Sequence, residues 1–230
     1  MSLVIKMTTE VEDPANFIAD SILNKLKEGK TVLFFVTGGS SIAVAVKVSE
    51  FLKGNDLKNL TIMMTDERYG ALNHADSNWH QMIEKGFSLP QAKLIPIITG
   101  DDFTTTIDKF NENLAYEFNV AGYTIGLFGV GKDGHTAGII PGSIAVESED
   151  LACGHHTPTF DRITITPKII ENLDEAVVFM QGEEKWGVVK DLVALPVPGR
   201  PREKNIDINK QPAQVLKRVP LLTIFTDYKK

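Results

Sequence analysis

The chain has 230 residues, 43% of them hydrophobic, and a formal net charge of −6 at pH 7. This length and composition fit one large α/β domain or two small ones, and one core is the simpler expectation. The acidic balance argues against nucleic acid as a general partner, because a phosphate-binding surface normally carries a basic excess. One cysteine excludes an internal disulfide framework and a zinc site built from several cysteines. Because no run of 18 apolar residues occurs, we expect a cytoplasmic protein that does not enter the membrane.

Helical and strand patterns alternate along the chain without a repeat or an obvious linker. Asp13-Pro14 predicts a capped helix that ends near Gly29. Short apolar runs predict strands at residues 31–36, 60–64, 94–98, 123–128, 162–166, 176–180 and 219–225. Helical spacing of apolar residues predicts helices at 42–52, 79–83, 107–118, 167–170, 186–193 and 212–216. We therefore expect a single α/β domain over residues 1–230 with a mostly parallel sheet. Residues 195–211 are irregular, and composition does not decide between a solvated connection and a lid.

A glycine turn joins the strand at 31–36 to the following helix. This turn contains Gly38, Gly39, Ser40 and Ser41. A helix N-terminus offers unpaired N–H groups, and glycines ahead of it let those groups reach a phosphate. The alternative is that one of the serines only caps the helix.

Charged residues follow the strand at 60–64, where Asp66, Glu67 and Arg68 lie in sequence. In an open α/β sheet, ligands bind at the carboxyl ends of the strands, so we expect these side chains at a binding site. The alternative is a solvated loop with a local salt bridge of little energy. Asn78 then stands at the start of the next predicted helix. The histidines near it lack the spacing of metal ligands, so we predict no metal site.

The stretch from Gly129 to Thr136 is the strongest site candidate, because it packs Gly131, Asp133 and His135 behind a strand. Its glycines satisfy the GxGxxG pattern, but Pro141-Gly142 follows too soon for the long helix that a dinucleotide fold requires. A P-loop is also disfavoured, because Asp133 occupies the position of the magnesium-binding Ser or Thr. We therefore expect no nucleotide cofactor.

The whole stretch, Gly129-Val130-Gly131-Lys132-Asp133-Gly134-His135-Thr136-Ala137 followed by Pro141-Gly142, resembles the signature of the 6-phosphogluconolactonase family. Six shorter pieces fall in the order of that family: Thr37-Gly38-Gly39-Ser40, Asp66-Glu67-Arg68, Asp76-Ser77-Asn78, Arg162-Ile163-Thr164-Ile165-Thr166-Pro167, Gly182-Glu183-Glu184-Lys185 and Gln211-Pro212-Ala213. The resemblance covers nearly the whole chain. It implies a modified doubly wound sheet flanked by helices, similar to that of glucosamine-6-phosphate isomerases, and no cofactor.

The resemblance implies hydrolysis of 6-phospho-D-glucono-1,5-lactone to 6-phosphogluconate in the oxidative pentose phosphate pathway. A histidine is suited to activate water near pH 7, since its ordinary pKa is about 6.5. We expect His135 to act as general base and Asp133 to orient it. The other expected contacts to the sugar phosphate come from Gly38, Gly39, Ser40, Ser41, Asp66, Glu67, Arg68, Asn78, Gly131 and Lys185, where Glu67 and Asn78 either contact sugar hydroxyls or hold Arg68.

Two other functions remain open. An isomerase of the glucosamine-6-phosphate type would carry an acid where this chain has Ile140, and an aromatic residue in place of Arg68. A non-catalytic sugar-phosphate sensor would usually have an attached DNA-binding domain. Ser41-Ile42 and Tyr69-Gly70 depart from the usual lactonase sequence and put the specificity in doubt. We expect a monomer or a weak homodimer.

Overall fold

A computed structural model describes residues 2–194 and 206–229 of the chain. Its main feature is a sheet of seven strands in the order β1-β10-β9-β6-β2-β3-β5, and every neighbouring pair is parallel. The strands are β1 (Ser2–Met7), β2 (Val32–Val36), β3 (Leu60–Met64), β5 (Lys93–Ile95), β6 (Tyr123–Phe128), β9 (Glu175–Met180) and β10 (Leu221–Thr226). The central strands β2, β6 and β9 are buried along their whole length, as their continuous apolar sequences predict.

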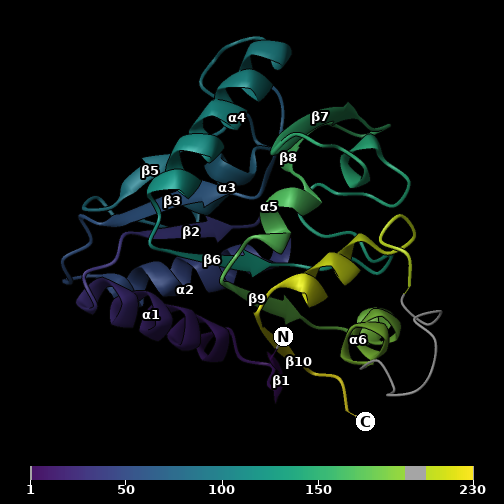
Figure 1. Ribbon diagram of the computed structural model, residues 1–230, viewed down its shortest axis with the longest axis horizontal. Coiled ribbons are helices and arrows are strands. Elements are labelled where there is room, and N and C mark those ends of the chain that lie inside the picture. Colours follow the sequence, from purple (N-terminus) through teal and green to yellow (C-terminus); the bar gives the residue numbers. More distant parts are fainter. Residues whose placement is uncertain (1, 195–205, 230) are drawn as a thin grey trace.

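Helices cover the sheet. They are α1 (Glu12–Lys27), α2 (Ile42–Leu52), α3 (Asn78–Glu84), α4 (Phe103–Val120), α5 (Pro167–Glu171) and α6 (Trp186–Val193). Figure 1 shows α1 and α2 side by side below the strands and α4 above them. Short 3-10 helices also occur: η1 (Gly39–Ser41), η2 (Ile144–Val146), η3 (Glu183–Lys185) and η5 (Pro212–Arg218). The predicted α/β class with a parallel sheet flanked by helices is confirmed.

A second, antiparallel sheet contains β4 (Asp66–Arg68), β8 (Asp161–Ile165) and β7 (Ala152–His156), in that order. One expectation was wrong here, because the strand predicted at 162–166 belongs to this sheet and not to the parallel sheet. Residues 66–68, for which a solvated loop was the alternative to a binding site, form a strand. Figure 1 shows this small sheet beside α4, above the large one. It brings charged side chains of β4 and β8 to the carboxyl end of the parallel strands.

Other differences from the prediction concern the ends of elements. Strand β1 was missed, because its partner β10 is remote in sequence. Asp13 does not cap α1, since the helix already begins at Glu12 and Asp13 lies in its first turn. The strand expected at 94–98 spans Lys93–Ile95, and the helix expected at 212–216 is the 3-10 helix η5. Of the irregular segment 195–211, residues 195–205 lie outside the described part of the chain. None of the helices described is long and apolar enough to span a bilayer.

Candidate active site

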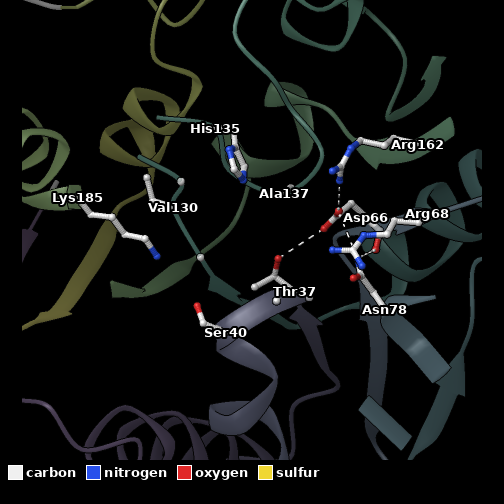
Figure 2. A pocket seen from close by; sticks show the side chains of 14 residues that line it. Thr37, Ser40, Asp66, Arg68, Asn78, Val130, His135, Ala137, Arg162 and Lys185 are labelled. Carbon is white, nitrogen blue, oxygen red and sulfur yellow. Dashed lines mark hydrogen bonds and ion pairs between the residues drawn. The ribbon is translucent and has the colours of Figure 1, made fainter. Parts of the chain in front are cut away.

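A cavity of about 310 Å³ opens at the carboxyl ends of the parallel strands. Figure 2 shows His135 above it, Lys185 on one side, and Arg68 and Arg162 on the opposite side. The predicted residues that line it are Gly38, Gly39, Ser40, Asp66, Arg68, Asn78, Gly131, His135 and Lys185. Segments far apart in sequence therefore meet at one place, as expected for ligand sites of open α/β sheets. Ser41, Glu67 and Asp133 do not line the cavity.

The loop after β6 presents the imidazole of His135. Nδ1 of His135 lies 2.6 Å from Oδ1 of Asp133, and the backbone N–H of His135 donates to the same oxygen at 3.2 Å. The turn is closed by hydrogen bonds from Gly134 N to Gly131 O and from Gly131 N to His135 O. Gly134 has a φ of +81°, a conformation that favours glycine. A Cβ on Gly131 would lie 2.2 Å from the imidazole, so only glycine permits this position of the ring.

Asp133 fixes the proton arrangement of the pair. Partial burial raises the pKa of Asp133, but hydrogen bonds from His135 and its charge outweigh this and hold the pKa below the usual value. The carboxyl group is therefore ionised and accepts a hydrogen bond from Nδ1–H. Because Nδ1 carries the hydrogen, Nε2 of a neutral His135 has a free lone pair. His135 can then accept a proton in the cavity, although its carboxylate partner lies outside the cavity wall.

The glycine turn after β2 forms the floor of the cavity. Gly39 has a φ of +66° and begins η1, which continues into α2. A Cβ on Gly38 would lie 2.2 Å from Oδ1 of Asn78, so the turn packs directly against that amide. Ser40 lines the cavity, whereas Ser41 is fully buried and its Oγ has no hydrogen-bond partner among the described residues.

Asp66 is a buried carboxylate that organises the polar wall of the cavity. It accepts hydrogen bonds from the hydroxyls of Thr65 at 2.8 Å and Thr37 at 3.5 Å, and from Asn78 Nδ2 at 3.4 Å. Its Oδ2 also lies 3.7 Å from Nη1 of Arg162. Asp66 therefore holds one arginine, one amide and one hydroxyl at the cavity (Figure 2).

Glu67 is fully buried and holds the start of α3. Its carboxylate accepts hydrogen bonds from the backbone N–H groups of Arg68 at 2.7 Å, Asn78 at 2.6 Å and Trp79 at 3.0 Å. The hydroxyl of Ser77 donates to it as well, at 2.9 Å. Burial is the larger effect and raises the pKa of Glu67 above its usual value, although these four donors act in the opposite direction. Of the two predicted roles of Glu67, this geometry favours holding Arg68 over a sugar contact, because its bonds fix the backbone of Arg68 and the start of α3.

Lys185 reaches the cavity from the opposite side, on η3 after β9. The turn before it contains Gly182, whose φ is +103°. Asp227 fixes this turn, because its carboxylate accepts from Gly182 N at 3.0 Å and from the indole N–H of Trp186 at 3.0 Å. Gly182 and Trp186, one before and one after Lys185, are thus hydrogen bonded to the residue that follows β10.

Five further residues line the cavity that sequence reasoning did not name as substrate contacts: Thr37, Gly129, Val130, Ala137 and Arg162. Arg162 is the important one, because it is charged. A cation at the start of the predicted strand 162–166 was the available signal, but only the pairing of β8 with β4 brings it to the cavity. The departures Ile42, Tyr69 and Gly70 do not line the cavity, and neither does Ile140. No group of three or more potential metal ligands occurs in the part of the chain that the structure describes.

The chain matches the family described as glucosamine-6-phosphate isomerases/6-phosphogluconolactonase over residues 8–219. It therefore belongs to that family. A 6-phosphogluconolactonase of Borreliella burgdorferi is 27% identical and covers 95% of this chain and 94% of its own length. The enzyme of that name from Neisseria meningitidis serogroup A is 30% identical over 76% of this chain and 79% of its own. A crystal structure of a 6-phosphogluconolactonase from Shewanella baltica covers 98% of both chains with a TM-score of 0.77 and 20% identity, which establishes the shared fold.

Proposed function

We propose that this protein is a cytoplasmic 6-phosphogluconolactonase that hydrolyses 6-phospho-D-glucono-1,5-lactone in the oxidative pentose phosphate pathway. The relatives that carry this name support the proposal. The observation that carries it is an imidazole, oriented by Asp133, at a cavity that has arginines on one side and a lysine on another. We further propose that residues 1–230 act as one domain, as a monomer or weak homodimer and without a cofactor.

In the proposed reaction, Nε2 of His135 takes a proton from a water molecule as the water oxygen attacks the lactone carbonyl. The new carbon–oxygen bond forms while the carbonyl electrons move to oxygen, which becomes an oxyanion. When the carbonyl reforms, the bond to the ring oxygen breaks and the ring oxygen receives the proton from His135. Asp133 stabilises the imidazolium between the two steps, because the carboxylate remains ionised and hydrogen bonded to Nδ1.

The phosphate of the substrate is a dianion and needs cations. Arg68, Arg162 and Lys185 line the cavity, and Asp66 is the one carboxylate among the described residues that line it. This excess of positive charge supports binding of a phosphate within a protein of net negative charge. N–H groups at the start of η1 are further donors. Holding the remote phosphate positions the carbonyl against His135.

The isomerase alternative has less support. Asp133 is the one acidic side chain that contacts His135 among the described residues, and Ile140 stands where the isomerases carry an acid. The pair therefore lacks the additional acid with which an isomerase opens the sugar ring. The sensor alternative has less support, because His135, oriented by Asp133, lines the cavity beside the cations, whereas binding of a sugar phosphate alone would need only the cations.

The experiment is to replace His135 with Asn and to measure acid release from freshly made lactone, with the spontaneous hydrolysis subtracted. General-base catalysis predicts a loss of about 10²-fold or more in kcat. Formation of fructose 6-phosphate from glucosamine 6-phosphate is measured beside it and is expected to be absent. A wild-type protein that releases no acid above background would refute the proposed function, and an active His135→Asn variant would refute the mechanism.

A further inference from the structure

Two of the cavity arginines lie directly opposite each other in the small sheet. In the antiparallel pair of β4 and β8, Arg68 is the register partner of Arg162. Like charges at directly opposite positions repel each other and destabilise a strand pair. Asp66 compensates Arg162 at 3.7 Å, and Arg68 donates from Nη1 to the carbonyl of Asp76 at 3.2 Å. These two contacts lie on different partners, so neither of them joins the two guanidinium groups to a common neighbour.

The ring of Phe160 is next to both groups. The guanidinium carbon of Arg68 lies 4.9 Å from the ring centroid, and that of Arg162 lies 5.9 Å from it. The electron-rich face of an aromatic ring attracts cations at this distance. The Nε atoms of both arginines are buried without a hydrogen-bond partner among the described residues. The ring therefore supplies a contact to both cations that hydrogen bonds do not.

The position of Phe160 is fixed by the turn between β7 and β8. The backbone N–H of Phe160 donates to the hydroxyl of Thr157 at 3.1 Å, and that hydroxyl donates to the carbonyl of Phe160 at 2.7 Å. The backbone N–H of Thr157 also donates to the carbonyl of Phe160, at 3.0 Å. Phe160 does not line the cavity, so its ring stands behind the arginines and not among the substrate contacts.

We propose that Phe160 is a positioning residue that holds Arg68 and Arg162 together for an anionic group in the cavity. The identity of that anion as the substrate's phosphate rests on the proposed function. The ring offsets part of the repulsion between the guanidinium groups when the cavity is empty and keeps them oriented. An anion then binds a preformed pair of cations instead of ordering two long side chains, which would cost side-chain entropy.

The test compares Phe160→Leu, which removes the aromatic face but keeps an apolar side chain, with Phe160→Tyr, which keeps the face. Calorimetry gives the Kd of inorganic phosphate, and kinetics with the lactone give KM and kcat. For Phe160→Leu we expect Kd and KM to rise about 5- to 30-fold with kcat changed less than about twofold, since two cation contacts are weakened. Phe160→Tyr is expected to bind phosphate as the wild type does. Phe160→Met is a second aliphatic replacement in case the leucine variant does not fold.

Phe103→Leu is the matched control, because Phe103 stacks on His156 and packs on Tyr69 near the same sheet, whereas the cation–π contacts of both arginines among the described residues are to Phe160. It is expected to leave the phosphate Kd unchanged. An unchanged Kd in folded Phe160→Leu or Phe160→Met protein would overturn the proposal, as would an equal loss of phosphate binding in Phe160→Tyr or Phe103→Leu. The calorimetric result stands apart from catalysis, so a wild type that binds phosphate but does not hydrolyse the lactone refutes the proposed function alone.

Discussion

Among the described residues, two histidine–aspartate pairs have the same Nδ1–Oδ1 distance. Nδ1 of His135 lies 2.6 Å from Asp133, and Nδ1 of His156 lies 2.6 Å from Asp161. The first imidazole lines the cavity, whereas the second is three-quarters exposed and stacks on Phe103. A hydrogen-bonded pair is therefore not sufficient to identify a catalytic histidine. Its position relative to the cations of the cavity makes the difference.

Replacing Asp133 with Asn tests the role of the first pair. The variant keeps the shape of the carboxylate but loses the charge that stabilises the imidazolium, so we expect kcat to fall by about 10²-fold or more with a smaller change in KM. Asp161→Asn is the control, because it alters the second pair in the same way. Equal kcat values for wild type and Asp133→Asn in steady-state assays would show that Asp133 does not assist His135.

Cys153 has a thiol that the structure makes unreactive. Burial raises its pKa to about 11. Only the thiolate is nucleophilic, so at pH 7.5 we expect very slow alkylation by iodoacetamide, with a rate that rises about tenfold per pH unit. Mass spectrometry of samples labelled at pH 7.5, 8.5 and 9.5 measures this. Because Cys153 does not line the cavity, labelled protein is expected to keep its activity. Rapid labelling at pH 7.5 would contradict the raised pKa.

At the scale of elements, the sequence predicted those helices and strands whose residues carry a local apolar pattern. The apolar strands at the centre of the sheet were found because burial on both faces requires continuous apolar residues. Strand β1 gave no such signal, because its residues are mostly exposed. It also pairs with a strand remote in sequence, since Ser2 is the register partner of Leu221. The strand at Asp66-Glu67-Arg68 was not predicted for another reason, because its residues are charged. Glu67 is buried there only because α3 supplies backbone donors to its carboxylate.

The candidate site divides in the same way. The glycine turns and His135 were predicted, because strand ends with glycines and polar residues have a local pattern. Arg162 was missed as a site residue, since an antiparallel pairing across about 90 residues of sequence brings it to Arg68. Local sequence could not decide whether Glu67 contacts the sugar or holds Arg68, because its hydrogen bonds depend on tertiary contacts that no local pattern records.

The loop that carries His135 packs against Gln211 and the first residues of η5. The backbone N–H of Ala213 donates to Gly134 O at 2.9 Å, and a Cβ on Gly134 would lie 2.2 Å from Cγ of Gln211. Gly134→Ala would thus add a clash to the strain of a positive φ. We expect it to cost about 2–4 kcal/mol of unfolding free energy and to lower kcat.

Gly29→Ala separates the two causes, because Gly29 has a similar φ of +78° but no heavy atom within 4 Å of its added Cβ. This control is expected to lose about 1 kcal/mol in urea denaturation and no activity. A Gly134→Ala variant no less stable than Gly29→Ala would show that Gln211 does not hold the loop.

At the scale of the whole molecule, the first and last strands of the described chain pair at one edge of the sheet, where β1 lies beside β10 (Figure 1). Asp227 follows β10 and ties this edge to the turn that carries Lys185. Slight burial raises the pKa of Asp227, but hydrogen bonds from Trp186 and Gly182 and the charge of Lys185 outweigh it and lower the pKa. The carboxylate therefore links folding of the sheet edge to the geometry of the cavity.

The sign of the resulting pH dependence follows from the lowered pKa. A carboxyl group whose pKa is lower in the folded state stabilises the protein fully above its unfolded pKa of about 3.9, and this stabilisation is lost as the pH falls through the folded value. Asp227→Asn is therefore expected to cost about 1 kcal/mol at pH 7, the usual value of charged hydrogen bonds discounted for partial exposure. The difference from wild type is expected to shrink below about pH 4. Asp227→Asn is also expected to raise KM, because the turn before Lys185 loses its hydrogen bonds to the carboxylate.

Urea denaturation of wild type and Asp227→Asn at pH 7, 5 and 3 measures this difference. The control is Asp56→Asn, a fully exposed carboxylate whose pKa is also lowered, by hydrogen bonds from Lys58, but which joins no two elements. Asp56→Asn is expected to leave the KM for the lactone unchanged. Because both carboxyl groups have a lowered pKa, both variants are expected to lose some stability at pH 7, and a raised KM confined to Asp227→Asn is the result that links the end of β10 to the lysine side of the cavity. A constant difference from pH 7 to pH 3 would show that packing, not the ionised carboxylate, holds this edge.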